Sequence, residues 1–475
     1  MSTPRSSPLV PHSDASRGSR TSVIDQLIAG LGRSRVLTDA DVVRSYVHDE
    51  AEWAPYSPPL AVVRATSTDD VQHTVRWALQ HDVPLVPRGA GTGLSGGANA
   101  VEGCVVVSLE KMNSVLEVNP LERIAVVQPG VVNDDLRKAV ATDGLWYPPD
   151  PASSPWSTIG GNVATNAGGV CCVKYGVTRD YVIGLEVVTG TGETVRLGRR
   201  TAKGVAGLDL AALFVGSEGT LGIVTEVTVK LRPLPDPGRT VLGYFDSIVD
   251  AGVAVRDVAA RGLTPSALEI VDRICLQAVD EMTGMGLASE ANVVLIGKVD
   301  EPGEAGATAA REMVAAFETG GATFVAETAD AEEADAMMAA RRLAYPAMER
   351  KGPLLTEDIV VAKEHVPEML RRIEQISQDV GVTIASVAHA GDGNLHPLMV
   401  AGRDDDDERV RAQQAFDRII DECLQLGGTV TGEHGVGLLK MPGAARELGP
   451  EVMAMQRAVK QALDPHGIFN PGKVF

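Results

Sequence analysis

The sequence predicts an α+β protein of two or three domains, and three observations lead to this prediction. The chain has 475 residues, which is too long for a single hydrophobic core. Patterns typical of strands alternate with patterns typical of helices along most of the chain. A proline-rich stretch, Arg232–Gly238, separates two regions of different composition. We therefore predict a first domain at 21–235, a second at 236–445, and a segment at 446–475 that returns to the first domain.

The charge of the chain excludes two classes of partner. It has 63 acidic residues against 43 Lys and Arg, a formal net charge of −20. Nucleic acids and anionic membranes both favour a basic surface, so we expect neither as a partner. A small anionic substrate is compatible with this charge, because a few local cations can reverse its sign inside a cleft.

The cysteines and the N-terminus indicate a cytoplasmic protein. Five cysteines, of which Cys171 and Cys172 are adjacent, form no disulfide framework, and this favours a reducing compartment. No apolar run has the length of a transmembrane helix. The first twenty residues lack the apolar centre of a secretory signal. We predict a disordered tail at 1–20 and a cytoplasmic location, either free or peripheral to the inner face of the membrane.

The first half alternates short strands with helices. Ser67 and Asp70 have the spacing of a capping box and begin a helix that reaches about Gln80. Residues 150–170 show little periodicity. The other expected helices are Val23–Leu31 and Asp134–Ala141, and the expected strands are Leu60–Val63, Pro84–Pro87, Cys104–Leu109, Ile124–Gln128, Tyr181–Val188 and Thr220–Leu231.

The second half has longer helical patterns between strands. This order predicts an antiparallel sheet covered by helices on one face. The expected helices are Asp250–Arg261, Glu304–Glu318, Ala331–Met348, Glu364–Val380 and Arg409–Leu426, and the expected strands are Ala267–Ile270, Val293–Lys298, Thr323–Glu327 and Ile384–Ala388.

A glycine-rich loop in the first half imitates a dinucleotide fingerprint. Gly91–Gly96 reads GTGLSG, with Glu110 downstream. Only Ala98–Gly103 separate this loop from the next strand, whereas a crossover helix needs about a dozen residues. The loop is nevertheless suited to an anion, because Arg88 precedes five glycines whose backbone N–H groups can surround phosphate oxygens. The alternative is a plain surface turn.

Two further stretches favour a cofactor over a surface turn. Residues 151–169 are mostly small and polar, so they pack poorly as a core but can lie along a flat polar cofactor. Residues 216–223 have the same character and lead into a strand.

Together these three stretches resemble the FAD-binding domain of the vanillyl-alcohol oxidase superfamily, the para-cresol methylhydroxylase (PCMH) type, over about residues 40–235. The resemblance implies two α+β subdomains that bind FAD. The residues that it assigns to the cofactor are Pro87, Arg88, Gly89, Ala90, Gly91, Thr92, Gly93, Gly96, Gly97, Ser153, Thr158, Gly160, Gly161, Asn162, Thr165, Glu218, Gly219, Ile223 and Asn470.

The resemblance also implies that FAD is not covalently attached. Some relatives attach it through a His in the first loop or a Cys in the second stretch. Here Thr92 stands in place of that His, and Trp156 or a close neighbour stands in place of that Cys. The pair Cys171 and Cys172 lies further on, and we expect it to be packed rather than reactive.

Two short glycine-rich motifs in the second half contain candidate metal ligands. His389 and His396 flank a strong turn sequence, GDGN, and a hairpin there would bring both imidazoles to one mouth. Glu433, in the motif GEHG, offers a third ligand. Two imidazoles and one carboxylate suit Zn²⁺ or a similar divalent ion, with a position left for substrate. The alternative is buried structural histidines and a solvated surface acid.

These motifs, together with Asn470–Lys473, are similar to the D-2-hydroxy-acid dehydrogenase branch of the superfamily. That branch includes glycolate oxidase catalytic subunits, cytochrome-type D-lactate dehydrogenases and D-2-hydroxyglutarate dehydrogenases. The resemblance assigns a metal to the same two histidines and Glu433. Asn470 and Lys473 are expected to return the tail to the flavin, or else to form a packed terminus.

Two further residues receive roles in catalysis. His434 is the expected general base, because an unperturbed imidazole titrates near neutral pH. The resemblance assigns the binding of the substrate carboxylate to Arg341. The alternatives are that Arg342, one residue away, has this role, or that both lie on a solvated helix face. Thr356 falls near the position at which some hydroxyglutarate enzymes carry a Lys. This difference favours lactate, glycolate or another small monocarboxylate.

The sequence thus predicts FAD-dependent, metal-assisted oxidation of a small D-2-hydroxy acid to its 2-oxo acid, with Zn²⁺ as the expected ion and hydride transfer to flavin N5. The expected electron acceptor is a quinone, a cytochrome or an electron-transfer flavoprotein, and the expected assembly is a homodimer. The alternative is a non-catalytic FAD-binding or electron-relay subunit of a larger oxidase. An aryl-alcohol or sugar-acid oxidase fits less well, because aromatic residues make up only 4% of the chain and the metal motif is present.

Overall fold

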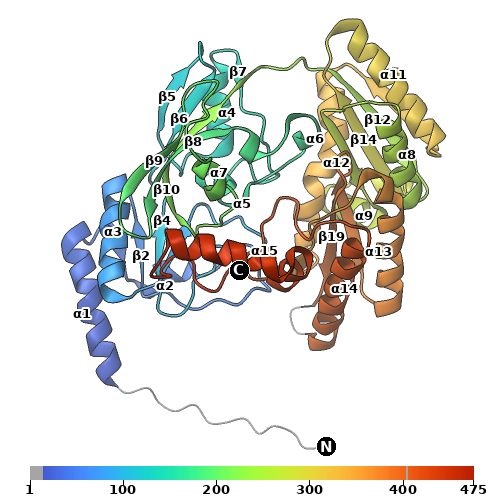
Figure 1. Ribbon diagram of the computed structural model, residues 1–475. Helices are drawn as coiled ribbons and strands as arrows, with labels where there is room; N and C mark the ends of the chain where they lie inside the picture. The colour runs from blue at the N-terminus through green and yellow to red at the C-terminus, as the bar shows by residue number, and fades with distance from the viewer. Residues whose placement is uncertain (1–13, 403–404) are drawn as a thin grey trace, which may run out of the picture.

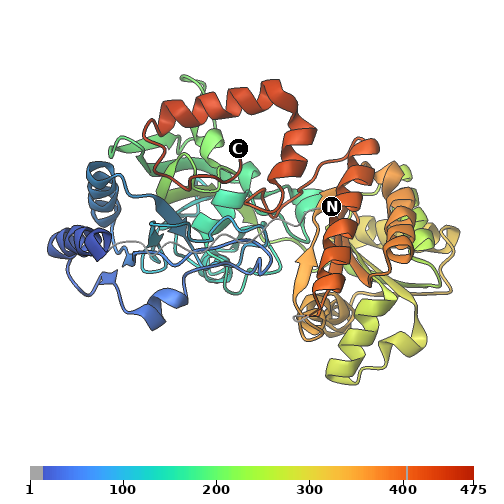
Figure 2. The same cartoon turned by 90° about the horizontal axis from the view of Figure 1, so that it is seen from below.

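The computed structural model describes residues 14–402 and 405–475, and they form two α+β domains that lie side by side (Figure 1). The first domain contains two sheets and the second contains one large sheet. The last long helix, α15, runs from the second domain back along the first (Figures 1 and 2). The α+β prediction is therefore confirmed.

The first subdomain is a four-stranded sheet in the order β1-β2-β4-β3. Its last three strands are parallel, and β1 is an antiparallel edge strand. Its strands are β1 (Val36–Leu37), β2 (Ala61–Arg64), β3 (Leu85–Arg88) and β4 (Val105–Ser108), and its helices are α1 (Asp14–Leu31), α2 (Ala40–Arg44) and α3 (Thr68–His81). No helix connects β3 to β4, as the short spacing after the glycine-rich loop predicts.

Two local predictions in this subdomain differ from the structure. Helix α1 begins at Asp14 and so includes part of the expected disordered tail, whose residues 1–13 lie outside the described part of the chain. A helix gains one hydrogen bond for each residue added after its nucleus, so it can extend past its apolar stretch. Ser67 caps α3 by accepting the N–H of Asp70. The Asp70 carboxylate instead accepts from Thr66, so the capping box is only half formed.

The second subdomain is a five-stranded antiparallel sheet in the order β5-β6-β10-β8-β9. Its core contains Leu136, Tyr147, Ile159 and Phe214. The strands are β5 (Val115–Asn119), β6 (Ile124–Val127), β8 (Val182–Thr189), β9 (Thr194–Gly198) and β10 (Gly222–Lys230), with the short pair β7 (Leu145–Trp146) and β11 (Arg232–Pro233). The helices are α4 (Asn133–Ala141), α5 (Ile159–Thr165), α6 (Cys172–Tyr175) and α7 (Leu210–Phe214), with a 3-10 turn at Thr178–Asp180.

The second domain is an eight-stranded antiparallel sheet in the order β15-β12-β14-β13-β18-β19-β16, with β17 also paired to β19. The strands are β12 (Arg239–Phe245), β13 (Ala267–Val271), β14 (Val293–Val299), β15 (Phe324–Thr328), β16 (Leu354–Thr356), β17 (Ile359–Val360), β18 (Ile384–His389) and β19 (Asn394–Val400). The helices are α8 (Ile248–Ala260), α9 (Arg273–Thr283), α10 (Leu287–Glu290), α11 (Gly303–Thr319), α12 (Ala331–Glu349), α13 (Val366–Val380) and α14 (Asp406–Gln425), with a 3-10 turn at Lys363–His365.

Helices cover both faces of this sheet, so the expectation of one covered face is wrong. Helices α8, α11, α13 and α14 share a core with one face. Helices α9 and α12 pack on the other face, where Leu276 and Ala344 lie against Ile296 and Ala385. Strand residues on both faces are apolar, and each apolar face must be buried against another layer. Helix α12, which packs on this second face, is the helix that lies next to the first domain.

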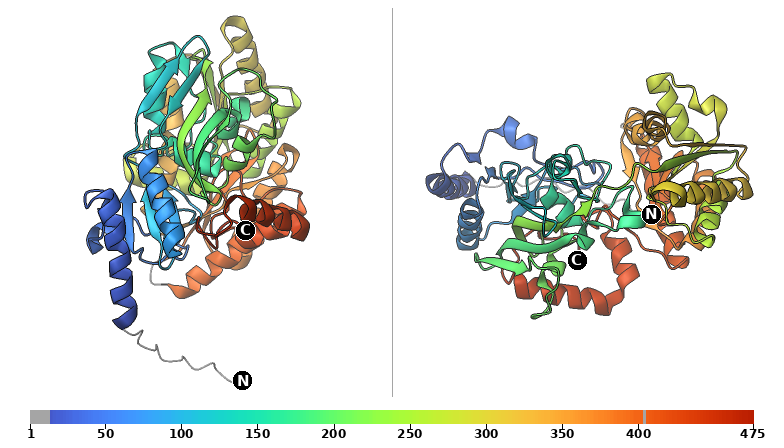
Figure 3. Two further views of the ribbon diagram at one scale, coloured as in Figure 1. Left: turned by 60° about the vertical axis from the view of Figure 1, so that its left-hand side comes forward. Right: turned by 90° about the horizontal axis from the view of Figure 1, so that it is seen from above.

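Helix α15 (Met441–Leu463) connects the two domains, and the sequence patterns missed it. It kinks at Gly449, whose φ is 73°, immediately before Pro450, because a proline cannot donate the helical hydrogen bond. Beyond the kink it packs on the second subdomain, where Lys460 donates to the carbonyl of Thr220 (Figures 2 and 3). The tail then places buried Phe469 beside Leu85 of β3. Within the described ranges, no helix combines the length and the apolar character needed to cross a membrane.

Candidate active site

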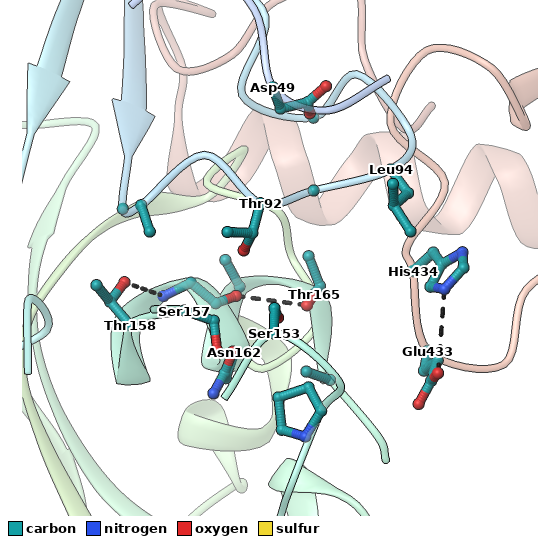
Figure 4. A pocket seen from close by; sticks show the side chains of 18 of the residues that line it. Asp49, Thr92, Leu94, Ser153, Ser157, Thr158, Asn162, Thr165, Glu433 and His434 are labelled. Carbon is teal, nitrogen blue, oxygen red and sulfur yellow. Dashed lines mark hydrogen bonds and ion pairs between the residues drawn. The ribbon is translucent and has the colours of Figure 1, made fainter. Parts of the chain in front are cut away.

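A cavity of about 510 Å³ lies between the two domains, which is within the size range of small-molecule and cofactor sites. The glycine-rich loop 87–98, the polar stretch 151–170 and the segment 214–224 form most of its walls. Helix α12 and the residues His389, His396, Glu433 and His434 complete it from the second domain. Figure 4 shows Thr92 opposite Thr165 and Ser153, with Glu433 and His434 at one end of the same pocket.

The glycines of these loops are required by close backbone approach. A Cβ atom added to Gly89 would lie 2.4 Å from the hydroxyl of Thr158, and one added to Gly160 would lie 2.5 Å from Pro129. Gly91 has a φ of 81°, which favours glycine. The first and second loops therefore contact each other at glycines, where a side chain would not fit. Without side chains there, the backbone of both loops lines the cavity.

Unsatisfied polar groups beside the cavity fit a polar cofactor. Arg88 Nη1 and Asn162 Nδ2 are buried and have no hydrogen-bond partner among the described residues, and both residues line the cavity. A buried donor without a partner is costly, so these groups are suited to the phosphates and polar edges of a nucleotide. Nearly all of the residues assigned to FAD line the cavity.

Gly96 and Asn470 are the two assigned residues that do not line the cavity. Gly96 packs against Ala54 and Leu438. Asn470 Nδ2 donates to the carbonyls of Gly97 and Glu218, at 2.9 and 2.7 Å. Asn470 therefore ties the first flavin loop to the third from behind the site. The tail does return to these loops, but the Asn470 side chain hydrogen-bonds to their backbone and does not line the cavity.

The groups that could attach a cofactor covalently are absent from the expected positions. Thr92 and Trp156 line the cavity, and neither offers an imidazole or a thiol for attachment. Cys171 donates to Asp150 at 3.0 Å, and burial raises the pKa of both the Cys171 and Cys172 thiols. All five cysteines are free.

The three candidate metal ligands converge on one carboxylate oxygen. Glu433 Oε1 lies 3.2 Å from His389 Nε2 and 3.5 Å from His396 Nε2. Two ligands about 2.0–2.1 Å from a tetrahedral ion are separated by about 3.3 Å, so the spacing fits a divalent metal. Strands β18 and β19 form the predicted hairpin, which pairs Val387 with His396 and brings both imidazoles to one face of the sheet.

Glu269 orients two of the predicted site residues. It is fully buried in β13 and lies 2.9 Å from His389 Nδ1. It also accepts from Arg341 Nε at 2.7 Å. An Nδ1–H donated to this carboxylate leaves Nε2 free for a metal, and histidines that bind metals usually donate their other ring N–H in this way. Arg341 reaches the same cavity from α12, so the structure brings the predicted carboxylate-binding residue to the candidate metal ligands.

Asp358 organises the loop that carries Glu433 and His434. Its Oδ2 atom accepts the N–H groups of Gly432, Glu433 and His434 at 2.8–2.9 Å, and the hydroxyl of Thr431 at 2.7 Å. Asp358, His396, Glu433 and His434 together form a second set whose ligand atoms lie within 4.8 Å of one another. The two sets share His396 and Glu433, and Asp358 could add a ligand through Oδ1, which has no hydrogen-bond partner among the described residues.

The electrostatics of the cluster keep its carboxylates ionised. Burial alone would raise the pKa of Glu433, but His389 and His396 lower it to about 2. Burial lowers the pKa of His434, against the opposing effect of Asp358. Burial likewise lowers the pKa of His396 to about 3. His434 and His396 are therefore neutral at neutral pH. Burial would lower the pKa of His389 as well, but Glu269 and Glu433 raise it well above its usual value, so His389 must release a proton when a metal binds.

The position at which some hydroxyglutarate enzymes carry a Lys is occupied here by a residue without charge. Thr356 lines the cavity, and its side chain is buried. Arg342 also lines the cavity but pairs with exposed Asp335 at 2.9 Å. Arg341 rather than Arg342 is therefore the residue whose guanidinium is buried, beside Glu269 and the candidate metal ligands.

Sequence reasoning missed Glu269, Asp358 and the buried Lys440. Lys440 Nζ lies 3.8 Å from Asp358 Oδ2 and 3.6 Å from Glu357 Oε2. A signal was present for the acids, since Glu269 and Asp358 interrupt apolar strand sequences, ALEIV and LLTEDIVV. A charged residue inside a buried strand must be paired. Their partners come from distant parts of the chain, so the sequence could not identify them.

Both halves of the chain match families of known proteins. Residues 59–198 match the family model described as an FAD binding domain, and residues 234–474 match the model for the C-terminal domain of FAD linked oxidases. The chain is 43% identical to "Glycolate oxidase subunit GlcD" of Bacillus subtilis (strain 168), over 88% of this chain and 89% of that protein. It is 35% identical to "D-lactate dehydrogenase" of Anaerostipes hadrus, over 93% and 94% of the two chains.

The fold also has solved relatives. The structure of 4-ethylphenol oxidase from Gulosibacter chungangensis superposes with a TM-score of 0.79 at 21% identity, and covers 95% of this chain and 96% of the other. This likeness confirms the α+β fold that the sequence resemblance implied.

Proposed function

Because the chain belongs to the FAD-linked oxidases, we propose that it oxidises a small D-2-hydroxy acid, D-lactate or glycolate, to the 2-oxo acid. FAD occupies the loops of the first domain, and a divalent metal is held by His389, His396 and Glu433. One observation carries the proposal: these three ligands and His434 lie at the end of the cavity that the flavin loops line.

The relatives support the class of substrate. Relatives at 35–43% identity include proteins named for glycolate oxidase, D-lactate dehydrogenase and D-2-hydroxyglutarate dehydrogenase, and all three names refer to 2-hydroxy acids. Thr356, in place of a cation, supports a monocarboxylate. The complete set of three ligands and a base disfavours a non-catalytic flavin subunit, which would have no use for it.

The residues divide the reaction among them. Arg341 binds the substrate carboxylate, since its planar guanidinium suits that group. When bound, FAD accepts the two electrons and the metal stabilises the developing alkoxide. His434 removes the hydroxyl proton at Nε2, because its Nδ1 is sealed from the cavity. Asp358 Oδ2, 4.0 Å from Nδ1, stabilises the imidazolium that forms.

Several finer assignments are part of the same proposal. We propose Zn²⁺ as the metal, because two imidazoles and one carboxylate are a common catalytic zinc set. The electrons pass to a quinone, a cytochrome or an electron-transfer flavoprotein, and FAD is bound without a covalent bond. The proposed domains are 21–235, 236–445 and 446–475, in a cytoplasmic homodimer or at the inner face of the membrane.

The test is anaerobic flavin reduction by a panel of D- and L-2-hydroxy acids, with metal analysis of the same sample. D-lactate or glycolate is expected to bleach the flavin absorption, whereas L-lactate and dicarboxylates are expected to react more slowly. Absence of bleaching with every acid in the panel would overturn the proposed function.

A further inference from the structure

The loop 431–437, which carries Glu433 and His434, is bound by carboxylates from both domains. Asp358 of the second domain accepts the N–H groups of its first half, as described above. Glu218 of the first domain accepts the N–H groups of its second half, with Val436 on Oε1 at 2.7 Å and Gly437 on Oε2 at 2.9 Å. Both carboxylates are almost fully buried.

The sequence resemblance assigned Glu218 to the flavin, but its side chain is engaged elsewhere. Both carboxylate oxygens are used by the loop, and the two hydrogen bonds span 218 and 219 residues of sequence. Gly435 lies so close that an added Cβ would be 2.9 Å from Glu218 Cδ. The backbone of Glu218, by contrast, belongs to the third flavin segment, since its N–H donates to the carbonyl of Ala164 next to Thr165.

Ser95 of the first flavin loop makes a second link to the same loop. Its hydroxyl donates to the carbonyl of Gly435 at 2.8 Å, and its own carbonyl accepts the N–H of Leu438 at 2.7 Å. Gly437 has a φ of 51°, and a Cβ there would lie 2.1 Å from the Ser95 carbonyl oxygen. Two of the three flavin segments therefore contact the loop that supplies a metal ligand and the base.

We infer that Glu218 is a positioning residue that couples the flavin site to the metal site, so that FAD and the metal each raise the affinity for the other. The inference rests on the proposed function for the identity of the two ligands. A flavin that orders the first and third segments also fixes Ser95 and Glu218. These residues fix loop 431–437 and with it the Glu433 carboxylate. Linkage requires the effect to be reciprocal.

The experiment measures FAD affinity in the full-length holoenzyme, either loaded with Zn²⁺ or treated with EDTA. The holoenzyme is diluted, and the fluorescence of released flavin gives the dissociation constant. For the wild type, chelation is expected to weaken FAD binding by at least about fivefold. Glu218→Gln is expected to bind FAD but to show a change below about twofold on chelation, because a side-chain amide cannot accept both N–H groups.

A matched control uses Glu193→Gln, a surface substitution in the same domain, where the side chain is 67% exposed. It is expected to behave as the wild type. Ser95→Ala is the second variant, and it decides the question if Glu218→Gln does not fold; its coupling is expected to fall below that of the wild type.

Three outcomes would overturn the inference. The first is unchanged coupling in a folded Glu218→Gln protein, or in Ser95→Ala where that variant decides. The second is a Glu218→Gln protein that no longer binds FAD, which would make Glu218 a cofactor-binding residue. The third is a wild type that binds Zn²⁺ but holds FAD equally well after chelation. A wild type that binds no Zn²⁺ would also remove the metal from the proposed function, and metal analysis distinguishes that case.

Discussion

His434 lies with a carboxylate near each of its ring nitrogens. Its Nδ1 is 4.0 Å from Asp358 Oδ2, and its Nε2 is 4.0 Å from Glu433 Oε1. The ring stacks on His396, with ring centroids 5.1 Å apart and an interplanar angle of 14°. Its own N–H is bound by Asp358, so its backbone is fixed and its ring is held by stacking. Such a fixed, neutral imidazole is suited to take a proton from a substrate in one orientation.

Replacing His434 by Ala should therefore remove the base and spare the ligands. We expect flavin reduction by the substrate to slow by about 10²–10⁴-fold, while the bound FAD and metal remain at wild-type levels. Stopped-flow absorbance of the flavin measures the rate, and metal analysis provides the control. A variant that reduces its flavin at the wild-type rate would exclude His434 as the base.

Glu269→Gln should weaken the metal site without touching a ligand. The amide cannot hold both Arg341 and His389 as the carboxylate does. Loss of such a partner commonly costs 10–100-fold in metal affinity, so we expect about that loss in a Zn²⁺ titration. Glu327→Gln, a surface position in the same sheet paired with Arg239, is the matched control. Equal Zn²⁺ affinity in Glu269→Gln and the control would show that Glu269 does not orient His389.

At the scale of elements, the flavin loops depend on close contact between backbones. The loop 89–104 replaces the helix that would normally join two parallel strands, and Thr158 closes it from the side at the start of α5. Gly89 lies at the contact between these two segments. Any side chain there must push the segments apart.

Gly89→Ala should consequently lower the affinity for FAD. The added methyl would lie 2.4 Å from the Thr158 hydroxyl, and overpacking of this kind commonly costs about 1–3 kcal/mol. We expect the dissociation constant of FAD, measured by flavin fluorescence, to rise by at least about fivefold. Gly204→Ala is the control, because its nearest neighbour is the flexible side chain of Arg199. If both variants bind FAD as the wild type does, the loop does not hold the cofactor.

Helix α9 offers a test of stability against pH. Its N-cap residue Asp272 accepts the N–H groups of Cys275 and Ser386, at 2.9 and 2.6 Å. Burial raises the pKa of Asp272 to about 6. The folded state thus holds the proton more tightly than the unfolded chain, whose Asp titrates near 3.9.

The contribution of Asp272 to stability should therefore be greatest below pH 4 and should decline as the pH rises to about 6. Relative to Asp272→Asn, which does not ionise, the wild type is expected to lose up to about 3 kcal/mol of unfolding free energy across this window. Urea unfolding of both proteins at pH 4, 5 and 7 measures the difference. A difference that is constant with pH, or that grows in favour of the wild type, would contradict this expectation.

The elements that the sequence predicted are those with a clear apolar period. Helices α8, α11 and α14 each bury one stripe against the large sheet, and that stripe is visible in the sequence. Helix α5 was missed because its sequence, IGGNVAT, contains two glycines and three β-branched residues, which are weak helix formers. Helix α15 was missed because Pro442, Gly449 and Pro450 interrupt its pattern. In both helices, tertiary packing overrides the local preference.

The candidate site was predictable where its residues are close in sequence. His389 and His396 lie on one hairpin, so the turn sequence alone brought them together. Glu433 and His434 were proposed from a second glycine-rich motif, and the family resemblance assigned the metal to the same set, but no local pattern places that motif beside the hairpin. Glu269 and Asp358 could not be placed, because their roles follow from the pairing of β13 with β18 and from the approach of loop 431–437. Such contacts are properties of the tertiary fold and not of any local pattern.

At the scale of the whole molecule, the two domains are joined around the cavity at several points. Lys174 and Tyr175 of α6 bind Asp300 of the second domain, and Lys174 also binds Glu301 at 2.6 Å. Val173, next to them, packs against Gly391 in the turn between His389 and His396. Helix α15 and the loop before it make the other connection (Figure 1). The proposed metal ligands are thus held from both domains, at the wall of the cavity that faces the flavin loops.

The most direct test of this account is the rate at which D-lactate or glycolate bleaches the flavin under anaerobic conditions, before and after removal of the metal. The account predicts that chelation, with FAD retained by added cofactor, slows reduction by at least about a hundredfold, and that Zn²⁺ restores the rate. Metal-free protein that reduces its flavin as fast as the loaded protein would contradict the central claim that His389, His396 and Glu433 hold a catalytic ion.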